Sequence, residues 1–198
     1  MATDYITSSD YINELTFDYV ETYSFRRGEA YDALEAEFKQ FQIRKRQDEE
    51  LNPDESERYS ALEDLFWRKP FIIDENGQFH PYSIKTNTFP HDHPIVDRIK
   101  EGLRTEIVQS LAMLCEHIYR DAFVFYNSNH EVVSTLSICL SCFDMRSSTQ
   151  PRIKADYKTF DYLKRLFLEI GHDVENPAYS VIEDIEKQME KVKKRKSK

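Results

Sequence analysis

Residues 121–142 read DAFVFYNSNHEVVSTLSICLSC, and the rest of the chain is best interpreted outward from this segment. Positions 122–126 are apolar almost throughout, as in a strand that is covered on both faces. Positions 127–130 are turn-forming residues, and positions 131–142 predict a second strand. In that second strand one parity is apolar and the other is small and polar, namely Leu136, Ile138 and Leu140 against Thr135, Ser137, Cys139 and Ser141. The segment therefore predicts a β-hairpin with one buried, apolar face.

Helical periodicity surrounds this hairpin on both sides. Apolar residues at steps of three and four predict amphipathic helices over 27–51, 54–68, 95–119, 157–170 and 178–194. Asn76-Gly77, between two apolar runs, predicts a second hairpin over 71–84. Residues 86–94 are expected to form a loop, because they are polar and contain two prolines.

These elements predict an α+β fold, with a small antiparallel sheet of hairpins packed against several amphipathic helices. With 198 residues, the chain has the length of one domain with extensions. We expect an extended arm at 1–24 that docks by its aromatic rings, a single α+β domain at 25–186, and a basic C-terminal tail at 187–198.

Composition excludes several classes of function. Four glycines, none clustered, are too few for the loops that bind phosphate through backbone N–H groups. No window approaches 18 consecutive apolar residues, and the first twenty residues carry four acids where a signal peptide needs basic and then apolar residues. Three cysteines do not indicate a disulfide framework. We therefore expect a cytoplasmic protein with reduced thiols, no membrane association and no cofactor.

Charge is unevenly distributed along the chain. The net charge is -9, yet residues 187–198 carry +6, so the remainder carries -15. An acidic body attracts a basic protein and repels nucleic acid, which leaves only the tail for nucleic-acid binding. The densest acidic cluster, between the first two predicted helices, consists of Asp48, Glu49, Glu50, Asp54, Glu55 and Glu57. We interpret this cluster as a docking surface for a basic partner, the alternative being a solvated connection between helices.

One pattern suggests chemistry instead. Cys139 and Cys142 have the spacing of a zinc-binding pair, and His91 and His93 could complete the site as an extended His-x-His pair. On a regular strand, however, the two cysteines have opposite parity and would face opposite sides of the sheet. Cys139 could also act as a nucleophile, although no flanking glycine turn or helix start marks it as activated. We therefore assign no catalytic, metal or cofactor-binding residue.

The segment from Arg120 to Cys142 resembles part of a group of small bacterial proteins without an established activity. The shared features are a strand ending in Phe-Tyr-Asn, a turn, a second strand ending in Ile-Cys-x-x-Cys, and a later helix similar to 157–171. About 50 residues are covered. The chain has Ile118 and Tyr119 where the group has a cysteine and a proline, so the resemblance does not imply a three-cysteine site and implies only an α+β hairpin module.

Together these features predict a non-enzymatic protein-binding module. Its most concrete form is an immunity-type inhibitor that covers the active cleft of a basic toxin or nuclease. The alternative is a metal-dependent or thiol enzyme that uses Cys139, Cys142 and the His91/His93 loop.

Overall fold

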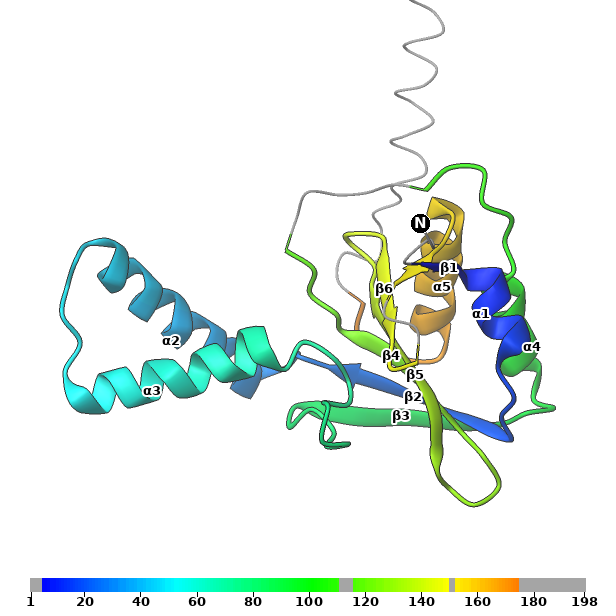
Figure 1. Ribbon diagram of the computed structural model, residues 1–198, viewed down its shortest axis with the longest axis horizontal. Helices are drawn as coiled ribbons and strands as arrows, with labels where there is room; N and C mark the ends of the chain where they lie inside the picture. Colours follow the sequence, from blue (N-terminus) through cyan, green and yellow to red (C-terminus); the bar gives the residue numbers. More distant parts are fainter. Residues whose placement is uncertain (1–4, 111–115, 150–151, 175–198) are drawn as a thin grey trace, which may run out of the picture.

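The computed structural model describes residues 5–110, 116–149 and 152–174, and it has an α+β fold built on one seven-stranded sheet (Figure 1). The strand order is β1-β7-β6-β5-β4-β2-β3. The β1–β7 pair is parallel and the other pairs are antiparallel. The strands are β1 (Ile6–Thr7), β2 (Tyr19–Phe25), β3 (Ser83–Pro90), β4 (Asp121–Tyr126), β5 (Val132–Cys139), β6 (Asp144–Ser147) and β7 (Ile153–Lys154).

Three helices cover one face of the sheet, namely α1 (Ser8–Glu14), α4 (Pro94–Leu103) and α5 (Tyr157–Glu169) (Figure 1). The apolar stripe of α5 meets Phe123 and Phe125 of β4 and Leu136 and Ile138 of β5 in the largest core cluster. All six residues of β4 are buried, which confirms the prediction of a strand covered on both faces. The 122–142 hairpin is thus the centre of the sheet.

The second face of the sheet is covered by the segment that follows the helical pair. Ile72 is fully buried there, and its backbone N–H donates to the Ser137 hydroxyl at 3.2 Å. The face that was expected to be small and polar is therefore also buried. Its small residues leave space for another stretch of backbone to lie directly on the strand.

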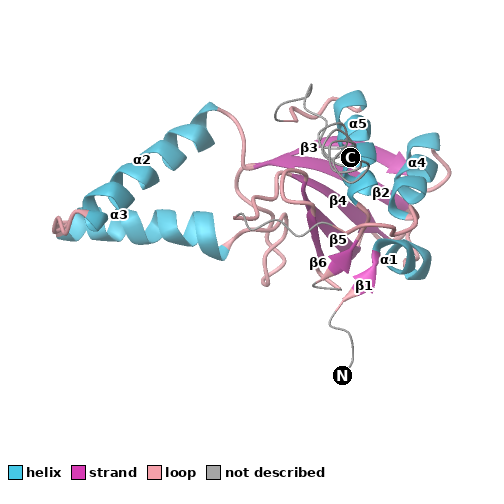
Figure 2. Ribbon diagram, turned by 90° about the horizontal axis from the view of Figure 1, so that it is seen from above, coloured by secondary structure: helices cyan, strands magenta, loops and turns pink. Residues whose placement is uncertain are grey.

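The helices α2 (Glu29–Arg46) and α3 (Pro53–Glu63) form an antiparallel hairpin that projects away from the sheet, as both views show (Figures 1 and 2). A π-helical turn, η1 (Asp64–Arg68), continues α3 toward the sheet. The hairpin has its own aromatic core, composed of Tyr31, Phe38, Phe41, Leu62 and Phe66. The sequence correctly predicted both helices from the spacing of these residues.

Three sequence predictions differ from the structure. Residues 19–24, expected in the extended arm at 1–24, form most of β2 between β3 and β4, because their alternating side chains complete both core faces. Residues 86–90, expected in the loop at 86–94, belong to the edge strand β3, since pairing with β2 supplies hydrogen bonds to the backbone on one side of the strand. The predicted hairpin at 71–84 is reduced to a single bridge, Ile73 to Phe79, around the Asp74–Gly77 turn.

The helix predicted over 95–119 ends at Leu103. Beyond it, the buried carboxylate of Asp156 accepts hydrogen bonds from the backbone N–H groups of Val108 and Gln109, at 2.9 and 2.7 Å. In a continuing helix these N–H groups would donate to backbone carbonyls four residues earlier. Because they donate to Asp156 instead, the chain does not continue as a helix here. The predicted 178–194 helix and the 187–198 tail lie outside the described residues.

In the part of the chain that the structure describes, no helix combines the length and the apolar character that crossing a membrane requires.

Candidate functional site

The acidic residues singled out in the sequence lie at the far end of the α2–α3 hairpin. Asp48, Glu49 and Glu50 follow the last turn of α2, and the other three belong to the first turns of α3. Five of the six side chains are exposed, and Glu55 is half-buried. Figures 1 and 2 show this end of the hairpin as the part of the described chain that reaches farthest from the sheet.

Two of the six acids are engaged within the hairpin. Arg44 donates to Glu49 at 2.6 Å and to both oxygens of Glu55 at 2.8 and 3.2 Å. The hydrogen bonds from Arg44 and from the Asn52 backbone hold the pKa of Glu55 below its usual value. These two acids close the hairpin and do not present free charge to a partner.

The other four acids, which we name the tip acids, are Asp48, Glu50, Asp54 and Glu57. Within the described chain, their side chains make no hydrogen bond or ion pair. The nearby cations Lys45 and Arg46 are also exposed, so the end of the hairpin is acidic without being uniformly negative. Four of the six acids in the predicted cluster thus carry charge that no side chain of the described residues neutralises, and the docking role of the cluster stays a prediction.

The hairpin holds its shape through contacts along its whole length. Asn52 and Glu55 form a capping box at the start of α3, and Arg58 pairs with Glu37 of α2 through two hydrogen bonds of 2.7 and 2.6 Å. At the root, Arg26 donates to the Tyr31 hydroxyl at 2.8 Å. The end of the hairpin is therefore presented by a preorganised support.

The structure does not bring the residues of the alternative enzyme site together. His91 follows Pro90. Both Pro90 and Tyr126, the last residue of β4, pair with Tyr19 of β2, so His91 lies near this end of β4. Cys139 follows Ile138, which pairs with Asp121 at the other end of β4. The length of β4 separates the two groups, about 17 Å at 3.3 Å per residue. In addition, the His93 ring caps α4, where its Nδ1 accepts from the Ile95 N–H at 3.1 Å.

The parity argument for the two cysteines was wrong. Both belong to the same buried cluster beneath the 71–82 segment, because β5 ends at Cys139 and the chain turns back before Cys142. The Ser141 hydroxyl lies 3.5 Å from the Cys139 sulfur. Cys139 is a free thiol, as expected, whereas Cys142 is disulfide-bonded, which corrects the prediction that all thiols are reduced.

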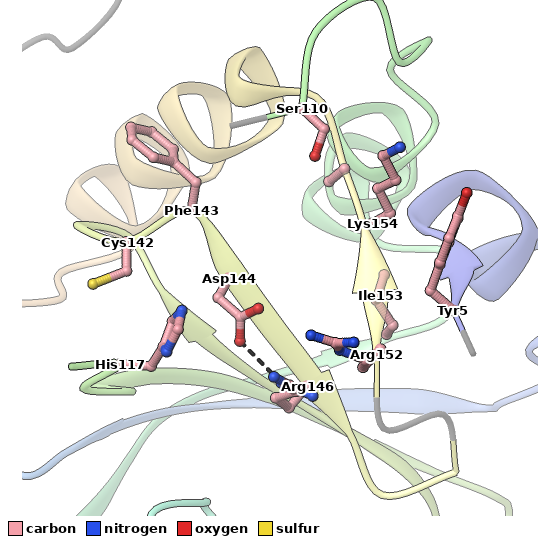
Figure 3. Close-up of a pocket in the computed structure, with 11 residues that line it drawn as sticks. Tyr5, Ser110, His117, Cys142, Phe143, Asp144, Arg146, Arg152, Ile153 and Lys154 are labelled. Atoms are coloured by element: carbon pink, nitrogen blue, oxygen red, sulfur yellow. Dashed lines mark hydrogen bonds and ion pairs between the residues drawn. The ribbon is translucent and has the colours of Figure 1, made fainter. Parts of the chain in front are cut away.

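A cavity of about 450 Å³ lies beside β6 and β7, at a place that the sequence analysis did not predict. Its polar lining includes Asp144 and Arg146 of β6, Arg152 directly before β7, Lys154 of β7, and His117. Figure 3 shows Arg146 and Arg152 reaching toward the same region, with Asp144 beside them. Because these residues are spread over 38 positions of the chain, only the pairing of the strands reveals the cluster.

A short network orients one wall of this cavity. The buried Tyr119 hydroxyl donates to Asp144, and Arg146 Nε donates to the same carboxylate oxygen at 3.0 Å. Burial and the hydrogen bond to Asp144 raise the pKa of Tyr119. Burial alone would lower the pKa of Arg146, but its contacts with Tyr119 and Asp144 outweigh this effect and raise it. Both groups therefore keep their protons across the ordinary pH range, and Arg146 remains a fixed positive charge.

A second polar network is buried in the sheet. The carboxylate of Asp121, which is 1% exposed, accepts two hydrogen bonds from Arg27 at 2.8 Å each. His172 Nδ1 lies 2.8 Å from the same carboxylate, and its Nε2 lies 2.8 Å from the Thr86 hydroxyl. The network joins β3 and β4 to the residues just after β2 and just after α5, and its members are enclosed by protein, which indicates a structural role.

Comparisons with protein-family models, with curated proteins and with solved structures gave no match for this chain. Its function must therefore be inferred from its own geometry.

Proposed function

We propose that this protein is a non-enzymatic binding protein that docks onto a basic protein partner through the tip acids of the α2–α3 hairpin. The observation that carries the proposal is the position of four unengaged carboxylates at the end of a preorganised, projecting element (Figure 1). Electrostatic complementarity of this kind accelerates association and selects among partners more than it raises affinity.

The shape of the hairpin supports a concave partner. An element that projects from the body of a protein can enter a cleft that a flat surface cannot reach. Its two helices are already held by the aromatic core and by the Arg58–Glu37 pair, so little conformational entropy is lost on docking. An immunity-type inhibitor that covers the active cleft of a basic toxin or nuclease fits these features, and we retain it as the specific form of the proposal.

The proposal is tested with two charge-reversed variants of the full chain. The tip variant carries lysine at Asp48, Glu50, Asp54 and Glu57. The body variant carries lysine at four other exposed acids without side-chain partners in the described chain, namely Glu14, Asp18, Asp92 and Glu106. Both variants have the same net charge, and circular dichroism establishes that both are folded.

Each variant and the wild type are used to capture proteins from extracts of the native host, and the association rate of any captured basic protein is then measured at low and high salt. We expect the tip variant to associate at least about tenfold more slowly than the wild type at low salt, with a smaller difference at high salt because screening shortens the range of the charges. The body variant should resemble the wild type. An equal loss in both variants, or the absence of a basic protein retained by the wild type, would overturn the proposal.

A further inference from the structure

The cavity beside β6 and β7 has a charge opposite to that of the chain as a whole. Its lining carries three cations, Arg146, Arg152 and Lys154, and one carboxylate, Asp144. The formal net charge of the lining is therefore +2, with His117 counted as neutral, in a chain whose net charge is -9. Such a local reversal of charge in a concave site concentrates anions there.

The strand register places two of these cations against each other. Met145 pairs with Ile153, and both side chains enter the core beneath the helices. One step along each strand, Arg146 and Arg152 therefore lie opposite each other on the other face of the sheet. Like charges directly opposite each other on two strands are destabilising, so an anion placed between the two arginines would stabilise the pair.

Of these cations, Arg146 has partners within the protein, whereas Arg152 and Lys154 carry charge that no described carboxylate neutralises. Asp144 engages Arg146 through Nε at 3.0 Å. Arg152 is exposed and forms no side-chain hydrogen bond or ion pair with the residues that the structure describes, and Lys154 makes only a cation–π contact with Tyr5, at 5.2 Å from the ring centre. Both charges remain available to a ligand.

We propose that this cavity binds a small molecule that carries a phosphate monoester group, held between Arg146 and Arg152. A guanidinium group matches the phosphate oxygens through parallel hydrogen bonds, and Lys154 adds a third cation. A phosphate monoester carries a charge of about -1.5 to -2 at neutral pH, which balances the +2 of the lining.

The size and the remaining walls of the cavity indicate that the ligand is larger than a free ion. A volume of about 450 Å³ lies within the usual range of small-molecule sites. Tyr5 provides an aromatic ring beside Lys154, and Ser110 offers a hydroxyl group at another wall (Figure 3). An organic group attached to the phosphate can thus be accommodated beside the two arginines.

The test is isothermal titration calorimetry of the full-length protein at low ionic strength with three probes: phenyl phosphate, inorganic phosphate and benzoate. Arg152→Gln removes one cation from the cavity. Arg165→Gln is the matched control, because it removes one positive charge from α5, where the Arg165 side chain is 73% exposed and pairs with Asp161. Both substitutions are at exposed positions, and circular dichroism verifies that each variant is folded.

We expect one phenyl phosphate to bind per chain, more tightly than inorganic phosphate and at least tenfold more tightly than benzoate. Arg152→Gln should weaken its binding at least tenfold, while Arg165→Gln should change it less than twofold. Binding should also weaken as the pH falls below about 6, where the phosphate group takes up its second proton. The proposal fails if phenyl phosphate does not saturate a single site, if both variants lose affinity equally, or if benzoate binds as tightly as phenyl phosphate.

Discussion

Replacement of Asp121 by asparagine should destabilise the protein strongly, because Asp121 neutralises a buried arginine. The Arg27 side chain is 14% exposed, and both of its terminal nitrogens donate to Asp121 at 2.8 Å. An asparagine amide keeps one acceptor oxygen but turns an N–H₂ group toward the second nitrogen of Arg27. The substitution therefore removes the negative charge and places two donors against each other.

The size of this effect follows from the cost of leaving a buried charge unpaired. Removing one partner of a buried ion pair costs about 3–5 kcal/mol. The lower value applies here, since the Ser24 hydroxyl and the Arg120 carbonyl still accept from Arg27 at 2.7 and 3.0 Å. We expect the free energy of unfolding to fall by about 3 kcal/mol, and Tm to fall by about 6–12 °C for a chain of this length.

Urea denaturation at pH 7 measures the change, with Asp92→Asn as the control because Asp92 is exposed and has no side-chain partner in the described chain. A loss of less than about 1 kcal/mol for Asp121→Asn would refute the reasoning, since it would place the Arg27 charge in effective contact with water.

The same carboxylate should contribute to acid unfolding. Burial alone would raise the pKa of Asp121, but the hydrogen bonds from Arg27 and His172 and the charge of Arg27 hold it below its usual value. The contribution to stability is therefore present above the unfolded-state pKa of about 4 and is lost as the pH falls toward the folded-state pKa. The difference in unfolding free energy between wild type and Asp121→Asn should accordingly be smaller at pH 3 than at pH 7.

Three further predictions concern stability. Burial, together with the charges of Arg26 and Lys69, lowers the pKa of His80 to about 4. Between pH 7 and pH 5 the unfolded chain therefore takes up a proton at His80 that the folded chain does not, and the protein loses stability. Replacing His80 with Gln should reduce this loss of unfolding free energy by about 2 kcal/mol. Gly102→Ala would bring a Cβ within 2.6 Å of the Tyr162 ring, so it should destabilise the protein by about 1–3 kcal/mol in urea denaturation, and by clearly less in a Tyr162→Ala background. Asn52→Ala removes the capping box of α3 and should cost about 1 kcal/mol by the same assay, whereas full stability would show that the cap contributes nothing.

The sequence predicted those elements whose structure is determined by nearby residues. The β4–β5 hairpin, α5 and the α2–α3 pair each have a clear periodicity and a local start or stop signal, such as Asn52-Pro53 before α3 and Gly171 after α5. The acidic end of the hairpin could also be identified, because the cluster is contiguous in sequence.

The remaining features depend on contacts between distant residues. The apolar stripe of α4 continues past Leu103, and only the carboxylate of Asp156, about 50 residues later, explains why the helix ends there. The charged cavity could not be predicted either, because Arg146 and Arg152 look like ordinary surface charges until the register of β6 and β7 places them together. The same is true of Asp121, whose partners Arg27 and His172 are 94 and 51 positions away.

The position at which the α2–α3 hairpin leaves the sheet affects how the sequence of the protein can evolve. Phe25, the last residue of β2, pairs directly with Ser83, the first residue of β3. The whole connection from 26 to 82 therefore starts and ends at neighbouring positions, and a tight turn could bridge the two strands. Within this connection, Arg27 and the part from 69 onward contact the sheet, so the helices between them can be lengthened, shortened or exchanged without rebuilding it. Selection, natural or in the laboratory, can thus give the hairpin a new partner while the sheet and its cavity stay the same.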